Sequence, residues 1–169
     1  MPRYALLLRG INLGSTNKIA MADLKELLTD AGYTDVRTHL NSGNVILTGP
    51  SAPAKTIEKA ITERTGFTVP CVVLTAKKLR AIVDGHPFAD VATNGSRMMA
   101  HVLGGTPSEE KLAAALARDP DNARSGPGVI YQWCPDGLLK APAVTEKIGV
   151  LVTARNWNTI AKLDALISA

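Results

Sequence analysis

Two short motifs of the same kind, Gly32-Tyr33-Thr34 and Gly66-Phe67-Thr68, each separate a helical pattern from a strand pattern. Before the first motif, apolar residues recur at helical spacing over Met21–Ala31, and before the second, Pro53 opens a similar pattern. Glycine readily adopts the left-handed backbone that ends many helices. The repeat therefore predicts two helices, each of which leads directly into a strand.

Three strand patterns lie around the first of these helices. Tyr4–Arg9 is apolar at nearly every position, which indicates a central strand covered on both faces. Val36–Leu40 and Val45–Thr48 flank Asn41-Ser42-Gly43-Asn44, whose Gly and Asn residues accept the positive φ of a hairpin turn. We expect the last two strands to form a β-hairpin.

A fourth strand, Val69–Leu74, follows the second helix, and Pro70 places it at an edge of the sheet. The resulting order is β-α-β-β-α-β, the split motif of ferredoxin-like folds, in which both helices cover one face of an antiparallel sheet. The sequence thus predicts an α+β protein whose first domain, residues 1–75, is ferredoxin-like.

Residues 76–169 form the second predicted domain. We expect a helix over Ala76–Val83 and a strand over Met98–Leu103. Thr106-Pro107-Ser108-Glu109 has the pattern of a capping box with Pro at the first helical position, so a further helix should begin there. Asp119–Gly128 is predicted to be a turn-rich loop.

The end of the chain has a second hairpin pattern and two helical patterns. Val129–Cys134 and Leu138–Lys140 read as strands around a turn, and Ala143–Ile148 as a short helix. Thr153 can cap a last helix, whose inward-facing residues would be Trp157, Ile160, Leu163 and Ile167. This half therefore has the order β-α-β-β-α and is a smaller, partial copy of the first.

Composition excludes several classes of protein. With 169 residues, of which 46% are hydrophobic, the chain can bury one core or two small ones and is not disordered. No apolar run approaches the roughly 20 residues of a membrane helix, and no secretory signal is visible, so we expect a cytoplasmic protein without a membrane partner.

The net charge of +4 would suit an anionic partner, but the basic residues are not concentrated in one part of the sequence. Residues 1–76 hold 8 basic and 6 acidic side chains, and residues 77–169 hold 11 and 9. Attraction to nucleic acid would therefore require a local patch, and with 4% aromatic residues a base-stacking platform is not indicated.

The cysteines and histidines do not form a metal-binding pattern. Cys71 and Cys134 are far apart and outside any CxxC pair, and His39, His86 and His101 are scattered. We predict two buried, unpaired cysteines and no structural metal, and no cofactor is indicated.

Three polar segments are candidates for ligand binding. The first joins the first strand to the first helix and runs from Arg9 to Lys18 through Gly10, Asn12, Gly14 and Asn17. Its glycines let backbone N–H groups approach a phosphate or carboxylate, and its two cations add positive charge. The alternative is a loop that only orders itself through Asn side-chain turns.

The second segment is the hairpin loop, which contains His39, Ser42 and Asn44. In the predicted fold the first two strands run in the same direction, so this loop and the first segment should lie at the same end of the sheet. Turn chemistry alone also explains the hairpin.

The third segment, Thr153–Thr159, contains Arg155 and Asn156 and begins the last helix. If it reaches Arg9 and Lys18, the three segments form a basic, Gly- and Asn-rich pocket between the two halves. Trp157 is either a core anchor or a stacking platform.

The strings LLRGINLGSTNK, HLNSGNV and TARNWNT, in this order and spacing, resemble the bacterial family known as domain of unknown function 1697. The resemblance runs from end to end and implies a cytoplasmic bacterial protein with a ferredoxin-like first half, an α+β second half and no established activity. The residues shared with the family are Arg9, Gly10, Asn12, Gly14, Asn17, Ser42, Gly43, Asn44, Arg155, Asn156 and Trp157. The chain departs from the family at Ser15, where a second glycine is usual, and at His39, where an aromatic residue is usual.

Three functions fit these patterns. The first is binding of an anionic ligand by Arg9, Gly10, Asn12, Gly14, Asn17, Lys18, Ser42, Asn44, Arg155 and Asn156. The second is an enzyme acting on a phosphorylated small molecule, although His39 is the one titratable acid or base in the three segments. The third is a non-enzymatic module that binds protein or nucleic acid. The ligand, the reaction, the pathway, the oligomeric state and the role of His39 are not indicated.

Overall fold

The computed structural model describes residues 1–169. Its internal contacts divide the chain into two compact units, described here one at a time. Unit 1 comprises Met1–Leu79 with Ala165–Ala169, and unit 2 comprises Arg80–Asp164. The predicted first domain, residues 1–75, falls entirely within unit 1.

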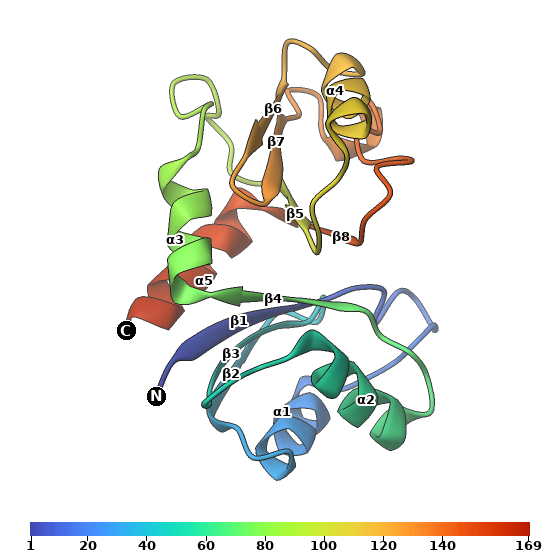
Figure 1. The fold of residues 1–169 in the computed structure, drawn as a ribbon, viewed down its shortest axis with the longest axis vertical. Coiled ribbons are helices and arrows are strands. Elements are labelled where there is room, and N and C mark those ends of the chain that lie inside the picture. The colour runs from blue at the N-terminus through green and yellow to red at the C-terminus, as the bar shows by residue number, and fades with distance from the viewer. The chain divides into compact units, whose positions relative to one another are not determined.

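Unit 1 has the predicted β-α-β-β-α-β order (Figure 1). Its elements are β1 (Arg3–Leu8), α1 (Met21–Asp30), β2 (Thr34–His39), β3 (Asn44–Thr48), α2 (Ala54–Thr65) and β4 (Cys71–Thr75). The strands lie in the order β2-β3-β1-β4, and every neighbouring pair is antiparallel. The ferredoxin-like prediction is confirmed, including the edge position of β4, the strand that Pro70 precedes.

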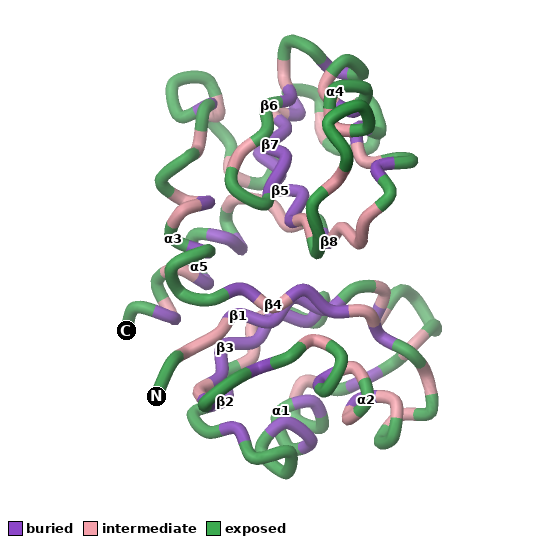
Figure 2. Tube along the Cα trace, viewed as in Figure 1, coloured by how far each residue is buried: buried purple, intermediate pink, exposed green.

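Helices α1 and α2 cover one face of this sheet (Figure 1). Leu24 and Leu28 of α1 and Ile61 of α2 are fully buried, and they pack in one apolar core with Leu6 of β1 and Leu47 of β3. Figure 2 shows the middle strands buried along their length and the outer helix surfaces exposed. The continuous burial of β1 from Ala5 to Leu8 explains why its sequence is apolar without alternation.

Glycine ends both helices as the repeated motif predicts. Gly32 and Gly66 have φ values of +103° and +82°, which lie in the left-handed region. The edge strand β2 that follows α1 is irregular. Its register with β3 shifts between Thr34 and Arg37, and Asp35 there has a φ of +49°. This irregularity is a β-bulge.

Two helices connect the units in sequence. Helix α3 (Ala76–Asp84) contains the boundary between Leu79 and Arg80, and α5 (Trp157–Ser168) contains the second boundary, after Asp164. Within unit 1, the Arg3 guanidinium donates hydrogen bonds to the carbonyls of Ile167 and Ala169. The end of α5 is therefore fastened to the beginning of β1.

Unit 2 repeats the strand order of unit 1. Its elements after α3 are β5 (Met98–Leu103), α4 (Glu109–Ala117), β6 (Ala123–Gly126), β7 (Val129–Trp133), a 3₁₀ helix η1 (Leu138–Lys140), β8 (Val152–Asn156) and the greater part of α5. The strands lie in the order β6-β7-β5-β8, again antiparallel throughout. The second half is therefore a fuller copy of the first than predicted.

Five predictions in this half are wrong. Leu138–Lys140 is a 3₁₀ helix and not a strand, and Leu139 is fully exposed. Ala143–Ile148 is not a helix: it forms overlapping turns, and Lys147 has a φ of +64° that no helix tolerates. The predicted loop Asp119–Gly128 contains β6, which pairs with β7.

The fourth error concerns Thr153, which does not cap α5. It lies in β8 opposite Val102, and the cap is Asn156, whose Oδ1 accepts a hydrogen bond from the Thr159 N–H at 3.0 Å. The residue that caps α4 also differs from the prediction and lies two positions later in the capping motif. Ser108, not Thr106, accepts the bond from the Lys111 N–H, because Pro107 still lies before the helix.

The turns after η1 occupy the place that α2 has in unit 1. Val144 and Ile148 are buried with Ala115 of α4 and Ile130 of β7 in one apolar cluster. The spacing of these two residues reproduces one face of a helix, and this explains the wrong prediction. The apolar contacts that a second helix would make are supplied here by successive turns.

Candidate functional site

The loops that follow β1 and β2 meet at one end of the first sheet, as predicted. The Leu8 N–H donates to the Gly43 carbonyl at 2.9 Å, and Nδ2 of Asn12 donates to the Asn41 carbonyl at 2.8 Å. We call residues 9–20 and 40–44 together the loop cluster. Two of the three candidate segments are therefore joined within unit 1.

Asn12 holds the longer loop together. Its Nδ2 donates to the Ile19 carbonyl, and its Oδ1 accepts from the Ile19 N–H, both at 2.9 Å. Asn17 contributes a further bond from Nδ2 to the Gly10 carbonyl at 3.2 Å. Both asparagines have positive φ, a conformation that asparagine tolerates better than most residues. The side chains of Asn12 and Asn17 are thus engaged within the cluster.

The tip of this loop is a tight turn at Gly14 and Ser15. The Thr16 N–H donates to the Leu13 carbonyl at 2.9 Å, which closes the turn. Gly14 has a φ of +58°, whereas Ser15 is not among the residues with positive φ. A serine in place of the family's usual second glycine therefore introduces no backbone strain here.

The hairpin loop packs closely against the longer loop. A Cβ at Gly43, where φ is +90°, would lie 2.8 Å from both Ile11 Cδ1 and Leu8 Cβ, so glycine is required. Asn44 is fully buried, and its Nδ2 donates to the His39 carbonyl at 2.9 Å and to Ser42 Oγ at 3.0 Å. The polar residues of this hairpin hold its own turn.

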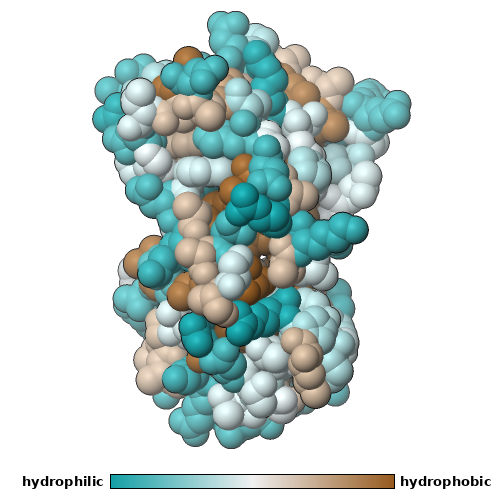
Figure 3. Space-filling model, turned by 90° about the vertical axis from the view of Figure 1, so that its left-hand side faces the viewer, coloured by the Kyte–Doolittle hydropathy of each residue, from teal (hydrophilic) through white to brown (hydrophobic).

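The loop cluster carries two exposed cations. Arg9 and Lys18 are both exposed, and neither forms an ion pair with a carboxylate. Two leucines of the same loop cluster, Leu13 and Leu40, are 64% and 55% exposed. The face shown in Figure 3 is mostly hydrophilic or intermediate in hydropathy, with smaller hydrophobic patches.

The third segment belongs to unit 2 and ends β8. Arg155 lies opposite Ala100 in the sheet, and burial lowers the pKa of its guanidinium to about 10. It remains a cation at neutral pH. Asn156 serves as the cap of α5 through its Oδ1. The expected meeting of Arg155 with Arg9 and Lys18 stays a prediction.

Trp157 belongs to an aromatic cluster and is only partly buried. Its ring centroid lies 4.3 Å from that of His86 and 6.2 Å from that of Tyr131. Tyr131 in turn donates its hydroxyl hydrogen to the Ile82 carbonyl at 2.6 Å. Burial lowers the pKa of His86, so the imidazole is neutral at pH 7. Ile160, Leu163 and Ile167 are buried as predicted.

One polar cluster had no recognisable pattern in the sequence. His101 of β5, Gln132 of β7 and Asp119 are all buried and are connected by hydrogen bonds across the face of the second sheet that α4 covers. These residues are separated by 31 and 13 positions and belong to no motif. Strand register alone brings them together. A single His or Gln between apolar residues does not predict such a cluster.

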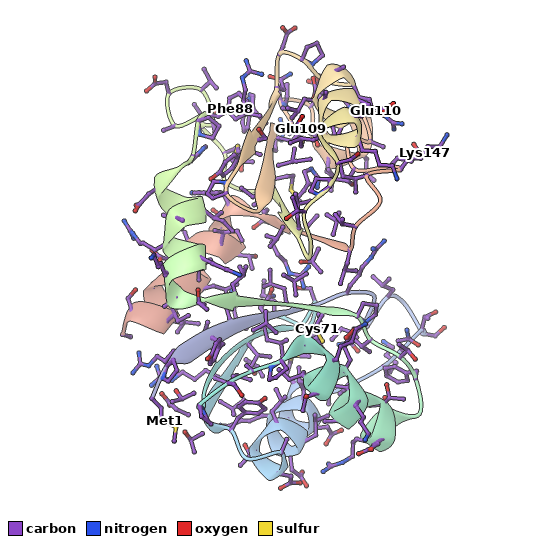
Figure 4. The ribbon with its side chains drawn as sticks, in the orientation of Figure 1. Met1, Cys71, Phe88, Glu109, Glu110 and Lys147 are labelled. Carbon is purple, nitrogen blue, oxygen red and sulfur yellow. The ribbon has the colours of Figure 1, made fainter.

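Both cysteines are buried and unpaired, as predicted. Figure 4 shows Cys71 between β4 and α2. Burial raises the pKa of the Cys71 thiol to about 12 and that of Cys134 to about 11, the latter with a contribution from the Asp119 charge. No three His, Cys, Asp or Glu side chains are grouped to hold a metal ion. None of the helices is long and apolar enough to span a bilayer.

Comparisons with known proteins agree with this fold. The chain is similar to the conserved bacterial protein SP0830 from Streptococcus pneumoniae, with a TM-score of 0.73 and 24% identity over 98% of each chain. Curated proteins give no match. The family model described as protein of unknown function (DUF1697) matches residues 1–131, which is more than half of the sequence. The chain therefore belongs to the DUF1697 family.

Proposed function

We propose that the protein binds a small anionic ligand, with a phosphate or carboxylate group, at the loop cluster of unit 1. The observation that supports this most is that two exposed cations without carboxylate partners, Arg9 and Lys18, stand on a loop held rigidly by Asn12 and Asn17. A preorganised loop binds with less loss of conformational entropy than a flexible one.

The hydrogen bonds distinguish the residues that shape the loops from the groups that can contact a ligand. The side chains of Asn12, Asn17 and Asn44 are engaged in shaping the loops. Direct contacts to the ligand therefore come from the guanidinium of Arg9, the ammonium of Lys18 and backbone N–H groups at the turn of Gly14. Asp23 lies in the first turn of α1, so that helix end is less suited to an anion than the loop.

Thermal unfolding in the presence of ligands tests the proposal. We would screen inorganic phosphate, pyrophosphate, mononucleotides, citrate and short oligonucleotides against the wild type and the variants Arg9→Ala, Lys18→Ala and Arg155→Ala. Lys25→Ala removes an exposed cation of α1 outside the loop cluster and is the matched control. A ligand at a hundredfold excess over its Kd adds about 2.7 kcal/mol to stability.

The expected result is a ligand-dependent rise in Tm that Arg9→Ala and Lys18→Ala abolish and Lys25→Ala retains. Loss of the rise in Arg155→Ala as well would support the shared pocket predicted from the sequence. Binding that weakens steeply with salt and requires an oligonucleotide would favour a nucleic-acid backbone as the ligand. The proposal fails if no anion raises the Tm of the wild type.

A further inference from the structure

A chain of buried hydrogen bonds in unit 2 leads to a cavity that the anion proposal does not involve. His101 Nε2 lies 2.9 Å from Gln132 Oε1, and Gln132 Nε2 donates to Asp119 Oδ2 at 3.0 Å and to the Pro142 carbonyl at 2.9 Å. His101, Gln132 and Asp119 are 6%, 0% and 9% exposed. Three polar side chains are thus ordered in an apolar setting.

The bonds fix the orientation of each group. Both hydrogens of the Gln132 amide are donated, so its oxygen accepts from His101 Nε2–H. His101 Nδ1 is then the unprotonated nitrogen, and it has no partner. Gln132 is held from both sides, and it holds one oxygen of Asp119. The other oxygen of that carboxylate, Oδ1, accepts no hydrogen bond within the chain.

Asp119 lines a cavity of about 140 Å³. Trp133, Asp136 and Lys140 also line it, together with Asn122, Cys134, Pro135, Gly137, Ala141 and Pro142. Sites for complete drug-sized ligands are roughly 300–1,000 Å³, so this cavity fits one small group only. The carboxylate of Asp119, a residue that is 9% exposed, therefore borders a space of the size of a single head group.

We propose that this cavity binds a small organic cation, an ammonium or guanidinium group, whose N–H donates to Asp119 Oδ1. A carboxylate that is nine-tenths buried gains most from a partner of opposite charge. Trp133 lines the same cavity, and indole rings attract cations more strongly than other aromatic side chains. A metal ion is less suited, because no three metal-ligating side chains are grouped.

Charges at the rim act in opposite directions. Asp136 and Lys140 are both exposed, so their charges are largely hydrated. Asp136 favours a cation in the cavity and Lys140 opposes it. Removing the charge of Lys140 should therefore strengthen binding, which a purely structural role of the hydrogen-bond chain does not predict.

The structural alternative is that the hydrogen bonds only fasten the Pro142 segment to the sheet. The variant Asp119→Asn distinguishes cation binding from this structural role, because an asparagine oxygen can still accept a hydrogen bond from Gln132 while the negative charge is lost. Asp121→Asn is the matched control, since Asp121 is exposed two positions away and does not line the cavity.

The experiment is a titration of the full chain with methylguanidinium, with methylammonium and, separately, with magnesium chloride. The indole N–H resonance of Trp133 reports on the cavity, and that of Trp157, the second of the two tryptophans, is the internal reference. We expect saturable shifts of Trp133 with an organic cation. Asp119→Asn should weaken binding at least about tenfold, and Lys140→Gln should strengthen it about two- to fivefold.

Three results would overturn the inference. One is the absence of a Trp133 shift with both organic cations, and another is equal binding by the wild type and Asp119→Asn. The third is a shift that magnesium produces and the organic cations do not. Thermal unfolding of each variant without ligand ensures that lost binding is not lost folding.

Discussion

The side-chain amide of Asn12 donates to the main-chain carbonyl of Asn41, 2.8 Å away, and joins two loops that are 29 positions apart. The same amide group also spans the longer loop to Ile19. This side chain therefore joins the two parts of the loop cluster, together with the close packing of Gly43 against Ile11.

Replacing Asn12 with alanine should destabilise unit 1 by about 1–3 kcal/mol, because three hydrogen bonds are lost and the positive φ becomes unfavourable. Asn41→Ala is the control, since only the main-chain carbonyl of Asn41 is used. Urea unfolding measures both variants. Equal loss in the two would show that the Asn12 amide does not hold the loops.

Gly43→Ala should cost more than Gly10→Ala. Both glycines have positive φ, at +90° and +76°, which costs an alanine about 1–2 kcal/mol. Only at Gly43 does the added Cβ also meet Leu8 and Ile11 at 2.8 Å, whereas nothing lies within 4 Å at Gly10. Denaturant midpoints of the two variants measure the difference, and similar midpoints would contradict the close packing.

Stability should fall as the pH is lowered from 7 towards 5. Burial lowers the pKa of His101 and His86 in the folded state, so below about pH 6.5 the unfolded chain binds more protons than the folded one. The loss continues until the pH passes the folded-state values. Chemical denaturation at several pH values measures the slope.

The variants His101→Gln and His86→Gln should each flatten this slope, and the double variant should flatten it most. An unchanged slope in the double variant would assign the pH dependence to other groups. His101→Gln keeps a donor for the Gln132 oxygen, so the comparison is made without removing that hydrogen bond.

Neither cysteine should react with iodoacetamide in the folded protein at pH 8. The reactive species is the thiolate, and burial raises the pKa of Cys71 to about 12 and of Cys134 to about 11. Mass spectrometry should find both alkylated after unfolding in urea. Rapid alkylation of the folded chain would show that one of these thiols becomes accessible in the native state.

The first half of the fold could be predicted because local signals agree there with long-range packing. Gly32 and Gly66 end helices, Pro53 begins one, and the strands between them are buried on both faces or closed by a recognisable turn. Topology then placed two polar loops at one end of the sheet. The cations Arg9 and Lys18 lie there as exposed side chains.

The second half was harder because its apolar residues do not follow one period. Leu138 and Leu139 resemble a strand but are exposed, and Val144 and Ile148 have helical spacing but lie in overlapping turns. Thr153 has the sequence context of a cap because it precedes the helix, but strand pairing with Val102 determines its position. The buried contacts of His101 depend on strand register, which no local pattern specifies.

The bulge in β2 has a consequence for behaviour at high concentration. An outer strand with a straight row of free N–H and C=O groups can recruit a strand from another molecule. At Asp35 the backbone turns out of that row, with a left-handed φ and a shifted register. The bulge should therefore weaken edge-to-edge pairing along β2.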